Sequence, residues 1–123
     1  MKLVLPLVLV VLSSGCAGAC EDEIIEVKPH RSHRAILFQR NCGATTGVNR
    51  QVSILPDDEQ LTGTGNVFIA DADQGAAFGK DPIVQLFWQA DGRLTVLHHP
   101  LVRIFKRQGT ANGVRITYEQ QPL

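Results

Sequence analysis

The C-terminal part of the chain carries the pattern that most constrains the fold, a strict alternation of apolar and polar side chains. Over residues 114–119, valine, isoleucine and tyrosine alternate with arginine, threonine and glutamate. Side chains that repeat with a period of two lie on one face of an extended strand. No stretch after the N-terminal apolar segment has a convincing helical period. The pattern therefore predicts strands and no helices.

Seven further short segments have a strand-like composition, and turn-forming residues separate them. Asp91-Gly92 predicts a tight hairpin, Asn112-Gly113 predicts a second one between the last two strands, and Pro29 marks a turn at residues 28–32. The sequence predicts an all-β fold, a single small domain of about eight short antiparallel strands forming a meander, open barrel or sandwich. The expected strands are residues 24–27, 33–40, 50–55, 67–70, 83–89, 94–98, 102–108 and 114–119.

The N-terminus has the three parts of a secretory signal. Lys2 supplies a positive charge, residues 3–12 are apolar, and residues 13–19 are mostly small. The apolar run is too short to cross a bilayer, which takes about 20 residues. We therefore expect an exported protein of the bacterial cell envelope.

Two cleavage sites are compatible with this signal. Ser13-Ser14-Gly15-Cys16 resembles a bacterial lipobox, although leucine is usual where Ser13 stands. Cleavage there makes residues 1–15 a lipoprotein signal peptide, Cys16 the lipidation site, residues 16–20 a short tether and residues 20–123 the β domain. Alternatively, ordinary signal peptidase removes residues 1–19 and leaves a soluble periplasmic protein that begins at Cys20.

The number of cysteines favours the lipoprotein. The chain has three cysteines, and an exported protein with an odd number leaves one without a disulfide partner. A lipid on Cys16 accounts for that one, and Cys20 and Cys42 are then expected to form a disulfide bond. The membrane is thus an expected partner, reached through the lipid on Cys16.

Charge and motifs exclude several classes of function. The chain has 12 basic and 12 acidic residues, so it lacks the basic excess that nucleic-acid binding needs. It has no Gly-x-Ser-x-Gly motif and no phosphate-binding loop with its lysine. We assign no catalytic residue and expect no cofactor.

The histidines and aspartates give little sign of a metal site. His98 and His99 would lie on opposite faces of a strand, and His30 and His33 flank a turn, so surface positions are expected for all four. Asp71, Asp73 and Asp81 could form a weak calcium site in an acidic loop, but Pro82 stands where an EF-hand loop has its last carboxylate. We predict no metal centre.

The segment at residues 39–47 is the candidate binding loop. Its glycines predict a sharp turn and its threonines offer hydroxyl groups, while Cys42 fixes its position if it is disulfide-bonded. A purely structural turn explains the same residues. The candidate binding residues are Arg40, Asn41, Gly43, Thr45 and Thr46.

This segment also resembles a family of small bacterial exported proteins of uncharacterised function, which share a Phe-x-Arg-Asp-Cys-Gly-Ala-Thr-Thr-Gly motif. The resemblance continues through Gly65-Asn66-Val67-Phe68 and residues 88–118 and covers most of residues 20–119. A Cys-Glu-x-Glu start in that family supports Cys20 as the partner of Cys42. Asn41 stands in place of the family's aspartate, and residues 28–31 replace its Ser-Pro-Asp-Gly turn. The resemblance implies no activity, substrate or cofactor.

Two hypotheses about function follow. The first is a lipid-anchored envelope β-domain that binds another protein or ligand of the envelope, as small accessory or inhibitor lipoproteins do. The second is a small envelope hydrolase or transferase that uses the loop at residues 42–47. The absence of a recognisable catalytic set favours the binding module over the enzyme.

Overall fold

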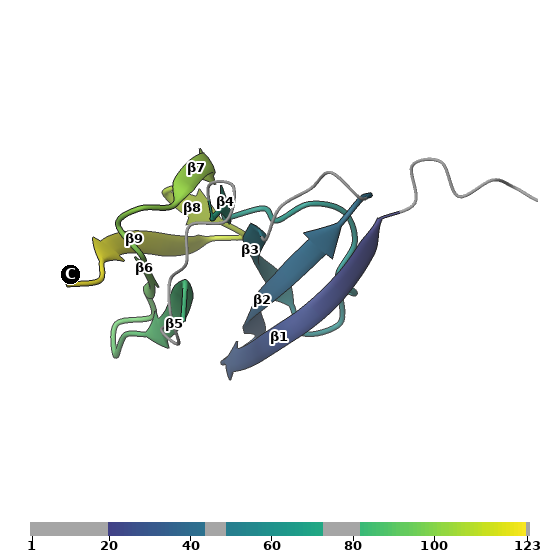
Figure 1. Cartoon of the computed structure of the whole chain (residues 1–123). Helices are drawn as coiled ribbons and strands as arrows, with labels where there is room; N and C mark the ends of the chain where they lie inside the picture. Colours follow the sequence, from purple (N-terminus) through teal and green to yellow (C-terminus); the bar gives the residue numbers. More distant parts are fainter. Residues whose placement is uncertain (1–19, 44–48, 73–81, 123) are drawn as a thin grey trace, which may run out of the picture.

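The computed structural model describes residues 20–43, 49–72 and 82–122, and these form two β-sheets (Figure 1). Within these ranges no helix is long and apolar enough to span a bilayer. The prediction of an all-β single domain is confirmed. The strands are β1 (Glu21–His30), β2 (His33–Asn41), β3 (Asn49–Pro56), β4 (Phe68–Asp71), β5 (Val84–Trp88), β6 (Leu94–His98), β7 (Arg103–Arg107), β8 (Thr110–Ala111) and β9 (Val114–Gln120).

The first sheet has the strand order β1-β2-β3-β4-β7, and the second has the order β5-β6-β9-β8. Every pair in the first sheet is antiparallel, whereas β6 and β9 in the second sheet run parallel. Figure 1 shows β5, β6 and β9 beside the long β1–β2 hairpin. The expectation of antiparallel strands throughout is therefore wrong for the pair β6 and β9.

The prediction of a hairpin between residues 102–108 and 114–119 is also wrong. β7 pairs with β4 in the first sheet, and only the two residues of β8 fold back on β9. The chain crosses from the first sheet to the second at Gln108 and Gly109. The backbone N–H of Gln108 donates to Val67 O beside the first sheet, and Gly109 O accepts from the N–H of Ile116 in the second. The turn at Asn112-Gly113 is where the sequence predicted it, with φ values of 48° and 78°.

The main core lies between the two sheets. Its buried side chains come mainly from β2, β3 and β4 on one side and from β5, β6 and β9 on the other. Phe68 is 0% exposed and has ring contacts with His98 and Tyr118, at centroid distances of 5.6 and 5.8 Å. A smaller cluster on the outer face of the first sheet consists of Ile36, Phe38 and Leu55, covered by Leu61. Successive side chains of β2 point to opposite faces of the sheet, so its apolar residues contribute to both clusters.

The β1–β2 hairpin is longer than the sequence predicted. β1 runs through Pro29, which pairs with Arg34, so the turn contains only Arg31 and Ser32. Proline is tolerated here because β1 is an edge strand, and one side of its backbone has no ladder partner. The disulfide between Cys20 and Cys42 closes the other end of the hairpin.

Side chains join the edges of the two sheets where β1 passes β5. Lys28 Nζ donates to Leu86 O at 2.6 Å, and Trp88 Nε1 donates to Lys28 O at 2.9 Å. These two bonds hold the end of β5 against the end of β1. They place the turn of the β1–β2 hairpin beside the turn between β5 and β6.

Tyr118 joins the sheets on the other side, and its ionisation should limit stability in alkali. Its hydroxyl lies 2.6 Å from Gln108 O and 3.2 Å from Val67 O, and burial raises the pKa of Tyr118 to about 12. An unfolded tyrosine ionises near 10, so the unfolded state loses its proton first. We expect the free energy of unfolding to fall as the pH rises from 10 to 12, and this fall to be smaller in Tyr118→Phe. Denaturant unfolding measured at pH 9 to 12 tests this; equal slopes in both proteins would contradict it.

Candidate functional site

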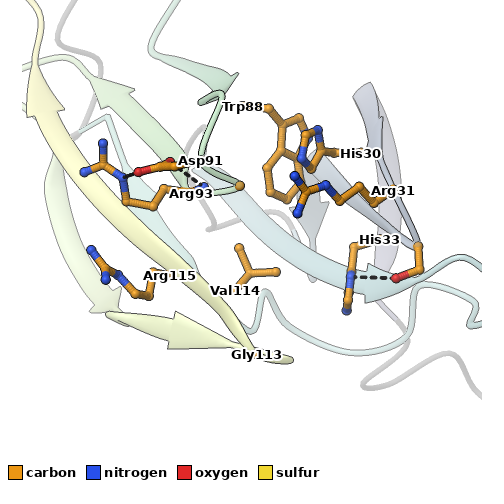
Figure 2. Close-up of a pocket in the computed structure, with 11 residues that line it drawn as sticks. His30, Arg31, His33, Trp88, Asp91, Arg93, Gly113, Val114 and Arg115 are labelled. Atoms are coloured by element: carbon orange, nitrogen blue, oxygen red, sulfur yellow. Dashed lines mark hydrogen bonds and ion pairs between the residues drawn. The ribbon is translucent and has the colours of Figure 1, made fainter.

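The described residues form a cleft of about 500 Å³ where three hairpin turns meet. The β1–β2 turn forms one wall, and the β5–β6 and β8–β9 turns form the other (Figure 2). We call this the three-turn cleft. Its lining residues are His30, Arg31, Ser32, His33, Trp88, Asp91, Gly92, Arg93, Gly113, Val114 and Arg115.

The first wall is built on the tight β1–β2 turn. His30 and His33 are its closing pair, so a two-residue loop brings both imidazoles to one face of the hairpin. His30 stacks on the indole of Trp88, with ring centroids 4.8 Å apart and ring planes 16° apart. Ser32 Oγ lies 3.3 Å from Nδ1 of His33. This wall therefore combines a flat aromatic surface with polar groups.

Arg31 occupies a backbone conformation that is unusual for its residue type. Its φ of 56° lies in the left-handed region, which glycine or asparagine normally fills in such turns. Its guanidinium extends toward the second wall (Figure 2), and Nη1 lies 3.6 Å from where a Cβ on Gly92 would be. Within the described residues no hydrogen bond or ion pair to the guanidinium is found. Arg31 is an exposed residue that lines the cleft, so its donors are open to solvent and to a ligand there.

The second wall carries one carboxylate and two further arginines. Asp91 accepts from the backbone N–H of Arg93 at 3.1 Å and pairs with Nε of Arg93 at 2.6 Å. The hydrogen bond from the backbone N–H of Arg93 holds the pKa of the Asp91 carboxyl below its usual range, and the charges of Arg93 and Arg115 lower this pKa further. Asp91 is therefore ionised at neutral pH. Figure 2 shows Arg93 and Arg115 side by side on the side of the cleft opposite His33.

The charges of the lining residues do not balance. The lining residues include three arginines, Arg31, Arg93 and Arg115, and one carboxylate, that of Asp91. The other lining residues carry no charge when the histidines are neutral, and the buried side chain of Val114 lies between the walls (Figure 2). With neutral histidines the cleft therefore keeps an excess of two positive charges in a recess that is open to solvent. Such a recess attracts anions.

The described part of the candidate loop, residues 39–43, does not line this cleft. Arg40 pairs with Asp22 at 3.4 Å and its backbone N–H bonds Asn49, while the side chain of Asn41 accepts from the N–H of Gly43 at 3.1 Å. These contacts stabilise the end of the hairpin and fit the structural interpretation of the turn. Thr45 and Thr46 lie outside the described residues. Cys16, the expected lipidation site, also lies outside them.

The disulfide predicted between Cys20 and Cys42 is present, with an S–S distance of 2.07 Å. Cys42 therefore has no thiol in this state and cannot act as a nucleophile. This removes the sulfur chemistry from the hypothesis of an enzyme that uses residues 42–47.

The histidines and aspartates differ from expectation in part. His98 is not on the surface: it is 4% exposed, because its ring packs on Phe68 and its Nδ1 lies 3.0 Å from His99 O. His30 and His33 share a face across the turn, which sequence spacing alone did not suggest. Asp71 pairs with Arg103 at 2.7 Å, and Asp73 and Asp81 lie outside the described residues. No metal-binding group of three or more ligands occurs among the described residues.

Sequence reasoning missed the three-turn cleft because its residues are far apart in the chain. Each of the three turns was marked in the sequence, and each carries an arginine next to or within it. Their convergence depends on the contacts of Trp88 with β1 and on the parallel pairing of β6 with β9. A recurring arginine beside a turn is the only sequence signal for the cleft.

The fold and the site define a small two-sheet β-protein with a basic cleft at one end of its first hairpin. No family model matches the chain, and no curated protein or solved structure matches it either.

Proposed function

We propose that this protein is a lipid-anchored binding module of the bacterial cell envelope that holds an anionic ligand in the three-turn cleft. The cleft is the observation that carries the proposal. It has the volume of a small-molecule site, three arginines and one ionised carboxylate. Arginine is suited to such a role because its planar fork binds carboxylates and phosphates through two parallel hydrogen bonds.

The conformation of Arg31 supports a binding role. A bulky side chain in the left-handed region costs on the order of 1–2 kcal/mol relative to glycine, so the position is unfavourable for stability alone. No bond from the Arg31 guanidinium to a described residue offsets that cost. An anion between the two walls would give Arg31 the partner that the described residues do not.

Chemical-shift mapping with small anions tests the proposed site. Inorganic phosphate, sulfate and citrate would be titrated into the ¹⁵N-labelled mature protein at constant ionic strength. We expect saturable amide shifts at residues 31–33, 92–93 and 113–115. Shifts concentrated on β7, which carries Arg103, Lys106 and Arg107, would place the anion site elsewhere. No saturable shift anywhere would contradict anion binding.

The anchor is tested independently of the cleft. If Cys16 carries the lipid, Cys16→Ala should move the protein from the membrane fraction to the soluble fraction or stop its processing. Cys20→Ala is the matched control and should stay with the membrane, because it removes the disulfide and keeps the lipid. Fractionation and intact mass measure both. Release by Cys20→Ala alone would contradict the assignment.

A further inference from the structure

We infer that the ligand of the three-turn cleft is a small soluble phosphate monoester whose organic part is planar or apolar. This inference rests on the proposed anion-binding function and specifies its ligand. It follows from the charge, the volume and the aromatic wall of the cleft.

The charge of the cleft favours a doubly charged group. Three arginines against Asp91 leave an excess of two positive charges, and a phosphate monoester carries about −1.5 to −2 at neutral pH. A carboxylate carries one charge and two acceptor oxygens, so a single guanidinium fork satisfies it. A monoester offers three terminal oxygens, which can accept from arginines of different turns. Arg31 and Arg115 lie on opposite walls, and the side chain of Arg115 extends away from Arg31 (Figure 2), so Arg115 would have to turn inward to contact the same phosphate.

The volume of the cleft exceeds that of a phosphate group. A cleft of about 500 Å³ is far larger than a phosphate, which fills the space of a few water molecules of about 30 Å³ each. The cleft therefore has room for an organic part beside the phosphate.

Beside its polar groups, the cleft offers one flat aromatic surface to that part. Trp88 lines the cleft with its indole N–H already bonded to Lys28 O, so the ring requires no polar partner from a ligand. Val114 lies between the walls, and the stacked pair of Trp88 and His30 forms one side (Figure 2). A planar or apolar group fits this surface. The glycerol backbone of a phospholipid offers no planar group, and its acyl chains stay in the bilayer, which favours a soluble ligand over a membrane lipid.

Calorimetry with three matched ligands tests the inference. Phenyl phosphate has the dianion and a ring, inorganic phosphate has the dianion alone, and benzoate has a ring with one charge. We expect phenyl phosphate to bind the mature protein at least roughly tenfold more tightly than either of the others, since it alone gains both the second charge and the aromatic contact. Vesicles of phosphatidylcholine containing phosphatidic acid should not displace it.

Two variants separate the parts of the ligand. Asp91→Asn removes the only carboxylate among the described residues that line the cleft and should tighten the binding of phosphate several-fold, an effect that misfolding cannot produce. Trp88→Leu should weaken the binding of phenyl phosphate by a larger factor than the binding of inorganic phosphate, because only phenyl phosphate loses the aromatic contact. A weaker affinity for phosphate in Asp91→Asn would overturn the role given to the charge.

The outcomes distinguish this inference from the function on which it rests. Benzoate binding as tightly as phenyl phosphate would overturn the dianion, and inorganic phosphate binding equally tightly would overturn the planar part. Displacement by phosphatidic acid vesicles would overturn the soluble ligand. In each case the cleft remains an anion site. If none of the three ligands binds, the proposed function fails as well.

Discussion

Phe68→Ala should lower the free energy of unfolding by about 3–5 kcal/mol, the largest effect of any single core substitution that we expect. Phe68 is 0% exposed, and its ring packs on His98 and Tyr118 between the two sheets. Removing the ring leaves a cavity that β-strands on both sides cannot easily collapse to fill. A small domain has a total stability of about 5–15 kcal/mol, so the variant should be close to unfolding.

Denaturant unfolding followed by far-ultraviolet circular dichroism measures this effect. Phe105→Ala is the matched control, because Phe105 is 64% exposed on the edge strand β7 and its loss should have little effect on stability. A loss below about 1 kcal/mol in Phe68→Ala would contradict a single core shared by the two sheets.

Removal of the disulfide should have the second-largest effect, about 3 kcal/mol. Cys20 and Cys42 are 22 residues apart in sequence, and their bond closes the open end of the β1–β2 hairpin. The disulfide restricts the conformations of the unfolded chain. The folded hairpin has nine paired positions that do not depend on the disulfide. The double variant Cys20→Ser, Cys42→Ser should therefore fold and be less stable.

Comparing that double variant with the wild-type protein, with and without reductant, isolates the effect of the bond. We expect reductant to destabilise the wild-type protein alone, to the level of the variant. If reductant left the wild-type protein unchanged, the bond would contribute nothing to its stability.

Local patterns predicted the parts of the fold that depend on local chemistry. The alternation in residues 114–119 gave β9, and Asp91-Gly92 and Asn112-Gly113 gave two turns, because positive φ values there favour glycine and asparagine. The disulfide followed from the number of cysteines and the expected lipid on Cys16.

Pairings between distant strands could not be predicted in the same way. β7 contains both basic and apolar residues, so its sequence is compatible with either sheet. Its pairing with β4 depends on where the chain crosses between the sheets, at Gln108 and Gly109. Pro29 indicated a turn, but the edge position of β1 allows it within a strand. The cleft depends on these long-range pairings, and for that reason the candidate site at residues 39–47 differed from the one that the geometry favours.

The fluorescence of Trp88 tests the central claim, that the three-turn cleft binds anions, most directly. Trp88 is the only tryptophan of the chain and lines the cleft, so its emission reports on this site alone. We predict a saturable change on titration with inorganic phosphate at constant ionic strength. The change should persist in Arg107→Gln, whose arginine lies on Tyr118 outside the cleft, and should be lost in the double variant Arg31→Gln, Arg115→Gln. A change that does not saturate, or that is the same in all three proteins, would contradict the account.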